Sequence, residues 1–450
     1  MTSSFSGLTN ALAALNVQRY GMEVTGQNIA NANTPGYTRQ RAELAAVGPT
    51  AGVAALYATQ HPNGSVTVTG TTRLNDPMID GRARTEHGDN GYRQTTATVL
   101  SSVETLFDEP SDNGLAEQLN DFWNSWAAVA NNPGDLAARN VVLQKAASLT
   151  SSINQSSANL DRLTQAVSQQ ASAATVEINT AAAALAQLNG DIAVASASGS
   201  NTNALADQRD ALLLKLADLT GAQSTINANG SADVTVGGLT LVTSTTASTL
   251  SLSSGNQILV GGTPAGPAGG TLQGLVDGLT TALPGYAAQL DAVAASLAST
   301  VNAGQSAGYD LAGNPGGPLF AGSTAATLSV VVTNPANLAA SGTPGGNLDG
   351  SAALGMSQLG SSTSGADAAY RALVGTLATD VQRANQQAAV QQAVTNNIDE
   401  LAQSSAGVSF DEETTNLLTY QRAYQASSRV MSTVDEVLDL LINHTGRAGL

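Results

Sequence analysis

The sequence predicts a mainly α-helical protein with a β-containing insert, in which helices from the two chain ends pair as a coiled coil. Apolar residues recur with an alternating three-four spacing near both ends. The interior from about residue 74 to 219 is rich in Ala, Leu and Gln, and the stretch from about 222 to 270 switches to a period of two. We therefore expect a β-containing insert inside a helical region, which itself lies between the terminal helices.

The N-terminal helix carries an apolar stripe that is interrupted at Arg19 and Gly26. The members of the stripe are Phe5, Leu8, Leu12, Leu15, Met22 and Ile29. The run Asn33-Thr34-Pro35-Gly36 is expected to end this helix. Pro35 disfavours helical geometry at the residue before it, and Gly36 permits a turn.

The C-terminal helix carries a second stripe with the same spacing, and Ser427 is its one small polar gap. Its members are Leu417, Tyr420, Tyr424, Met431, Val434, Leu438 and Leu441. Ser409 followed by Glu412 predicts a capping box at the start of this helix. Such stripes are typical of coiled coils, so we expect the two to face each other. We expect full burial only when further copies cover them, with termini mobile in the monomer and ordered in a polymer.

The segments between the ends divide into three predicted domains. A terminal coiled-coil domain takes 1–36 and 407–450, a helical middle domain takes 37–220 and 366–406, and an outer β-containing domain takes 221–365. Within the last, Gly237-Gly238 predicts a hairpin turn between short apolar strands. A helical segment is expected near 285–303, after Pro284. A Gly/Pro-rich loop at 304–322 and a strand at 328–332 should follow.

Composition excludes several function classes. The formal net charge of -17 and the pI near 4.3 give no electrostatic basis for binding nucleic acid or an anionic membrane surface. The chain has no cysteine, hence no disulfide and no thiolate chemistry. The N-terminus lacks the basic and continuous apolar regions of a cleaved signal peptide, and no apolar run is long enough to span a membrane. An extracellular location therefore requires export without signal cleavage.

The sequence predicts no catalytic, cofactor-binding or metal site. His61, His87 and His444 are far apart, and none has a partner at metal-ligand spacing. No Lys-Ser/Thr follows the Gly-rich run at 261–266, as a phosphate loop would require, and no G-x-S-x-G elbow occurs. The aromatic cluster at 122–126 is expected to pack in a core between helices, with a subunit contact as the alternative.

Both chain ends resemble the signatures of flagellar axial proteins, the family of rod, hook and hook-associated subunits. The N-terminal segment Gln27 to Tyr37 and the C-terminal tail from Val408 to Leu441 carry this resemblance. The signature residues are Asn28, Asn31, Asn33, Thr34, Pro35, Gly36, Tyr37, Gln421, Ala423 and Tyr424. Interior segments, Leu106 to Leu115 and Asp207 to Asp210 among them, resemble the members that form the first junction between hook and filament.

The resemblance implies a structural role for this chain. It implies a ring of copies around a central channel, with the hook protein on one side and a second hook–filament junction protein on the other. It also implies export through the flagellar type III apparatus to an extracellular position, and an export chaperone on the C-terminal helix. The alternative functions, in decreasing order of preference, are another axial protein such as a hook or distal rod protein, a secreted coiled-coil adhesin, and an enzyme. The segments Glu109 to Asp112 and Asp207 to Asp210 favour the junction.

Overall fold

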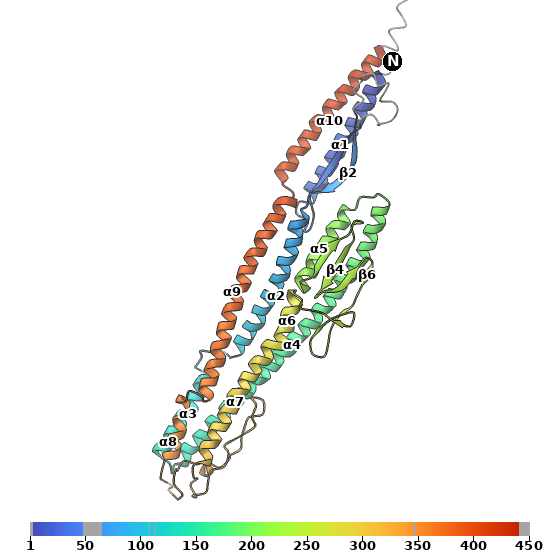
Figure 1. Cartoon of the computed structure of the whole chain (residues 1–450). Helices are drawn as coiled ribbons and strands as arrows, with labels where there is room; N and C mark the ends of the chain where they lie inside the picture. Colours follow the sequence, from blue (N-terminus) through green and yellow to red (C-terminus); the bar gives the residue numbers. More distant parts are fainter. Residues whose placement is uncertain (1–2, 48–64, 108, 113, 346–347, 441–450) are drawn as a thin grey trace, which may run out of the picture.

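The two chain ends form one antiparallel helix pair at one end of an elongated molecule (Figure 1). The computed structural model describes residues 3–47, 65–107, 109–112, 114–345 and 348–440. Helix α1 (Ser3–Ala30) packs along helix α10 (Phe410–Asp439). Helix α1 is followed by turns that end at Gly36, whose φ of +77° is the left-handed conformation that glycine tolerates.

The start of α10 only half matches the predicted capping box. The Ser409 hydroxyl accepts a hydrogen bond from the Glu412 backbone N–H at 3.4 Å. The Glu412 carboxylate does not complete the box, because it pairs with the guanidinium of Arg39 at 2.7 Å. The N-cap is therefore present, while the Glu412 side chain connects the helix to a different segment.

A β-hairpin that the sequence analysis did not anticipate packs along α1. Strands β1 (Gln40–Val47) and β2 (Ser65–Arg73) are antiparallel, with a register shift between Glu43 and Leu44. The assignment of residues after 37 to a helical middle domain needs correction here, because this segment is extended and lies on the terminal pair. Alternating Val and Thr in β2 favour a strand, since β-branched residues suit a half-buried pleated surface.

The rod below the terminal pair is a bundle of long helices (Figure 1). Helix α2 (Pro77–Phe107) runs beside α9 (Ala366–Ala406), while α3 (Leu115–Asn131) and α5 (Asn203–Thr220) flank α4 (Leu136–Ala197). With 62 residues, α4 spans ~93 Å and serves as the backbone of the rod. Its buried residues join one continuous apolar core that includes the aromatic cluster of α3, where Phe122 and Trp126 are 0% exposed.

Two small antiparallel sheets lie against α4. One contains β3 (Gln223–Ile226), β4 (Ala232–Val236), β5 (Leu239–Thr243) and β6 (Thr246–Ala247) in that order. The other contains β7 (Leu250–Leu252), β8 (Ile258–Val260) and β9 (Thr263–Pro264). The predicted turn is present: Gly237 and Gly238 have φ of +53° and +81°, and two positive φ values in succession require glycine.

The helix expected after Pro284 begins earlier than expected. Helix α6 (Gly270–Asp277) continues through a π-helical turn η2 (Gly278–Ala282) into α7 (Leu283–Ser306). A proline inside a regular α-helix clashes with the carbonyl four residues before it. The wider π-helical turn directly before Pro284 relieves this constraint, so one helical stretch runs through and packs against α2, α4 and α9.

The far end of the rod is closed by short elements and loops. They are β10 (Phe320–Ala321), β11 (Ser329–Val330), η3 (Pro335–Asn337), α8 (Ser351–Ser357) and η4 (Leu359–Ser361). The strand expected at 328–332 is reduced to the two residues of β11. The Arg139 side chain, 1% exposed, donates to the backbone oxygens of Pro133 and Leu338 and so fixes these loops to α4. Across the described residues, no helix is both long and apolar enough to cross a membrane.

Candidate assembly site at the chain ends

Three contacts define the line along which α1 and α10 approach most closely. A Cβ built on Gly7 would lie 3.6 Å from the Val434 side chain, and one built on Gly21 would lie 2.6 Å from the Tyr420 ring. At the base of the pair, the Asn28 amide donates to the Glu413 carboxylate at 3.0 Å. From Gly21 to Asn28 and from Tyr420 back to Glu413 the step is seven residues on each helix. The pair therefore has one antiparallel register along its length.

The apolar stripe predicted on α1 flanks this line. Leu8, Met22 and Ile29 each follow a contact residue by one position, which is about 100° further around the helix. With Leu15 they are partly buried, and Leu12 is 47% exposed. The side chain of Phe5 lies outside the described part of the chain. The line of closest approach thus contains Gly7, Gly21 and Asn28 on α1. That the two apolar stripes also meet each other stays a prediction.

The stripe predicted on α10 faces α1 but is only half covered. Leu417, Tyr420, Met431, Val434 and Leu438 are partly buried, whereas Tyr424 is 38% exposed. Leu441 lies outside the described residues. Among the described residues of α10, Glu413 alone is fully buried. Val430, Val437 and Leu440 add exposed apolar surface beside the stripe. The described part of α10 therefore leaves apolar surface available for further contacts.

A buried polar cluster, which we call the Asn28 cluster, joins three segments at the base of the pair. It contains Asn28, Tyr37, Arg39, Gln40 and Glu413. The Asn28 side chain, 1% exposed, donates to the Gln40 backbone oxygen at 2.8 Å. Its own oxygen accepts from the Tyr37 hydroxyl at 2.9 Å and from the Gln40 N–H at 3.0 Å. One amide thus connects α1, β1 and α10.

The Asn28 cluster also contains a buried ion pair. The Arg39 guanidinium pairs with Glu413 at 2.8 Å, and Glu413 is 2% exposed. A buried carboxylate is costly unless it is paired and hydrogen-bonded, and Arg39 and Asn28 supply both partners. Burial, with the negative charges of Asp207 and Glu413, raises the pKa of Tyr37 to about 12. The Tyr37 hydroxyl therefore stays protonated at neutral pH and keeps its hydrogen bond to Asn28.

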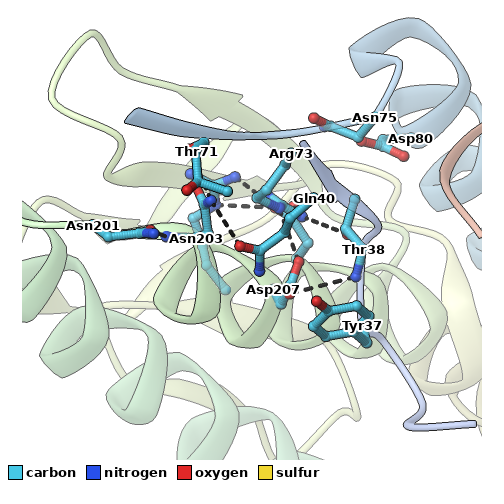
Figure 2. A network of polar contacts seen from close by, with 12 residues as sticks. Tyr37, Thr38, Gln40, Thr71, Arg73, Asn75, Asp80, Asn201, Asn203 and Asp207 are labelled. Carbon is cyan, nitrogen blue, oxygen red and sulfur yellow. Dashed lines mark hydrogen bonds and ion pairs between the residues drawn. The ribbon is translucent and has the colours of Figure 1, made fainter. Parts of the chain in front are cut away.

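A second group, the Arg73 cluster, attaches the hairpin to the rod through α5 (Figure 2). It contains Thr38, Arg73, Asn203, Asp207 and Asp210. Arg73 at the end of β2 pairs with Asp207 at 2.8 Å and with Asp210 at 2.6 Å. Asn203 donates to the Thr71 backbone oxygen at 3.0 Å. Burial raises the pKa of Asp207. Described contacts between the hairpin and the rod are thus mainly charged and polar.

The signature residues divide between this base and the surface. Asn28 and Tyr37 belong to the Asn28 cluster. Thr34 donates to the Asn31 side chain at 3.2 Å within an exposed turn, and Asn33, Pro35 and Gly36 are exposed beside it. On α10, Ala423 is partly buried and Gln421 is exposed. Gly21 was not among the predicted contact residues, and Glu412 was predicted only as part of a capping box. The ion pairs of Arg39 with Glu412 and Glu413 have no local sequence signal, because the partners are more than 370 residues apart.

The described side chains offer little for metal or histidine chemistry. No group of three or more His, Cys, Asp or Glu able to hold a metal ion occurs within the described part of the chain. His87 contacts Asp399 at 2.9 Å across α2 and α9, and the other two histidines lie outside the described residues.

Comparisons with known proteins match almost the whole chain. The family profile described as "Flagellar hook-associated protein FlgK helical domain" matches residues 100–320. Profiles described as "Flagella basal body rod protein" and "Flagellar basal body rod FlgEFG protein C-terminal" match 8–38 and 390–443.

Individual relatives agree with these profiles. Flagellar hook-associated protein 1 of Bacillus subtilis is 30% identical over 100% of both chains, and that of Escherichia coli is 24% identical over 97% of this chain and 99% of the relative. The solved structure of the flagellar hook junction protein FlgK from Burkholderia pseudomallei is similar with a TM-score of 0.64 and 19% identity. It covers 72% of this chain and 100% of that one, and it supports the fold.

Proposed function

The chain belongs to the flagellar hook-associated protein 1 family of structural hook–filament junction proteins, and on that premise we propose that α1 and α10 are its assembly elements. The observation that carries the proposal is the partly exposed apolar surface on both helices. Helix α10 has one fully buried residue among those described, although its stripe repeats over six positions from Leu417 to Leu438. Burying such side chains contributes about 1.5–3 kcal/mol each.

Further copies of the chain are the proposed cover for this surface. The residues we assign to the interface are those of the two stripes: Phe5, Leu8, Leu12, Leu15, Met22, Ile29, Leu417, Tyr420, Tyr424, Met431, Val434, Leu438 and Leu441. A ring of copies repeats one contact around an axis, so the same surface of each subunit is covered by its neighbour. The low share of charged residues, 11%, suits close lateral contact because few charges lose water.

The finer partners follow from the family rather than from contacts in this chain. We propose the hook protein on one side of the ring and a second hook–filament junction protein on the other. An export chaperone bound to α10 in the cytoplasm would cover the apolar stripe before assembly. The chain would then leave the cell through the flagellar type III apparatus without cleavage of a signal peptide, and function as an extracellular part of the flagellum.

Charge placed in the α10 stripe tests the proposed assembly role. Val434→Asp with Leu438→Asp should leave the rod folded, because both side chains are remote from the rod core. Bacteria carrying this variant as their sole copy should lose motility and release filament protein into the medium. Each buried carboxylate would cost several kcal/mol. The readouts are swimming in soft agar and the amount of filament protein in the culture supernatant.

The matched control adds the same charge elsewhere on α10. Gln425→Asp with Ser432→Asp lies on exposed positions outside the stripe, and it should retain motility. Normal filaments on the Val434/Leu438 variant would refute the assembly role of the stripe.

A further inference from the structure

One aromatic ring meets a glycine in the contact between α1 and α10. The ring of Tyr420 lies where a Gly21 side chain would be: a Cβ on Gly21 would stand 2.6 Å from one ring carbon and 2.8 Å from two others. Gly21 is buried. Glycine in a helix interior is destabilising by roughly 0.5–1 kcal/mol relative to alanine. The close approach of the Tyr420 ring gives a physical reason for a glycine at position 21.

The α1 positions one heptad before and after Gly21 leave no comparable space for the ring. Seven residues before Gly21 lies Ala14, and seven residues after it lies Asn28. If α10 slid by one heptad in either direction, the Tyr420 ring would face a residue that carries a Cβ. Because a Cβ at Gly21 already falls inside contact distance, the same ring has no room at Ala14 or Asn28 without a shift of the helices. The Tyr420 ring therefore fits the observed register and is excluded from the two registers that are shifted by one heptad.

Apolar burial alone specifies this register weakly. After its first turn, α10 faces α1 with side chains that are only partly buried. In the heptad register, two small residues, Ser427 and Ala14, lie opposite each other. Stripes of period seven match themselves again after every heptad. A register defined by such stripes needs an additional specific contact, as a single polar or shaped residue provides in other coiled coils.

We propose that Gly21 and Tyr420 form a steric register key, which fixes where α10 lies along α1 and hence which apolar residues of the two helices are displayed together. The key acts with the Asn28 cluster one heptad below it, where Asn28 and Arg39 hold Glu413. This inference rests on the proposed role of the terminal helices in assembly. Gly21 and Tyr420 are positioning residues, since their effect on assembly passes through the surface that the paired helices present.

Cysteine cross-linking measures the register directly, because the chain has no cysteine of its own. The in-register reporter is Gly7→Cys with Val434→Cys, since a Cβ on Gly7 would lie 3.6 Å from Cγ2 of Val434, a position that a cysteine Sγ can take. The off-register reporter is Gly7→Cys with Ser427→Cys, one heptad away. Both are placed in the full chain and oxidised in whole cultures of bacteria that carry it as their sole copy, so that assembled and unassembled chains are both measured.

Enlarging the glycine should shift the register. Gly21→Val should lower the in-register cross-linking yield by about tenfold or more, which corresponds to ~1.4 kcal/mol of overpacking. The off-register yield and the loss of motility should rise together. Gly26→Ala is the matched control on the same helix, because nothing lies within 4 Å of the Cβ it adds. It should leave both yields and motility unchanged.

Shrinking the ring should compensate for the enlarged glycine. Gly21→Val combined with Tyr420→Ala should recover in-register cross-linking relative to Gly21→Val alone, which a loss of helix stability would not do. Unchanged in-register yield in Gly21→Val overturns the register key. Failure of compensation in the double variant overturns it as well. Absence of the Gly7–Val434 cross-link in the otherwise unaltered chain overturns the helix pairing itself, and with it the assembly proposal.

Discussion

At the scale of single residues, Asn28 shows how a signature residue can act as a structural connector. Its amide makes four hydrogen bonds to three residues, and three of these bonds involve Gln40 of β1 or the Tyr37 hydroxyl beside it. The buried Glu413 depends on it and on Arg39 for its partners. Few side chains other than an amide supply two donors and an acceptor in so small a volume.

Replacing Asn28 should open the base of the terminal pair. Asn28→Ala leaves the Glu413 carboxylate and the Gln40 backbone groups short of partners in a buried place. The free energy of local opening should fall by about 2–3 kcal/mol, the usual cost of unsatisfied buried groups. Hydrogen exchange at the β1 amides measures it. Asn31→Ala is the control, since its side-chain bonds are exposed. Equal opening free energies for the two variants would contradict this role for Asn28.

Asp367 supplies a second prediction at this scale, because its environment can be read by fluorescence. Its carboxylate accepts a hydrogen bond from the Trp123 ring N–H at 2.8 Å, and burial raises the pKa of Asp367. The folded state therefore holds a proton at pH values where the unfolded chain has lost it. The contribution of this carboxyl to stability is largest at low pH, and it falls as pH rises from about 3.9 through the folded-state pKa.

A fluorescence titration of the folded protein should therefore show a transition above the ordinary Asp range. Asp367→Asn should abolish this transition and flatten the corresponding slope of stability against pH. Asp121→Asn, which removes from the helix that carries Trp123 a partly exposed carboxylate paired with Lys145, should leave the transition in place. A transition that persists in Asp367→Asn would show that another group reports on Trp123.

At the scale of elements, the sequence predicted those whose signals are local. The helix stop before Gly36, the Ser409 cap and the Gly237-Gly238 turn all depend on a few adjacent residues, and the structure contains each of them. The burial of Phe122 and Trp126 followed from their position on an apolar helix face. Fold class was therefore predictable, because long helices at both ends and short strands between them each carry a periodic pattern.

The elements that sequence reasoning missed depend on distant partners. The hairpin after residue 40 contains Arg and Glu, which interrupt its alternation, and it becomes stable by packing on α1. The continuation of the helix through Pro284 depends on a π-helical turn that packing against α2 favours, with Gly278 close to Val99. On α1, the largest apolar residues suggested the contact face. Gly21 was the better indicator, but only the position of Tyr420 reveals it.

At the scale of the whole molecule, the terminal pair and the rod differ in how they are held together. The rod has a continuous core whose residues run from Ala97 on α2 to Ala388 on α9. No described residue of the terminal pair belongs to that core. In the described residues, it joins the rod through the chain itself and through polar contacts such as those of Arg73 with α5. Contacts of this kind leave a unit less stable locally than a shared apolar core does.

This difference predicts unequal hydrogen exchange in the monomer. Backbone amides of α1 and α10 should exchange rapidly in dilute solution, because much of the apolar surface of both helices is exposed or half-exposed until other copies cover it. Amides of α4 and α9 should be protected by the core of the rod. In assembled flagella, the protection of α1 and α10 should rise toward that of the rod, whereas the rod should change little. Mass-spectrometric exchange on monomer and flagella gives both values for each peptide.

Strong protection of both end helices in the monomer would mean that one chain completes its own terminal core, and the apolar surface would then need another explanation.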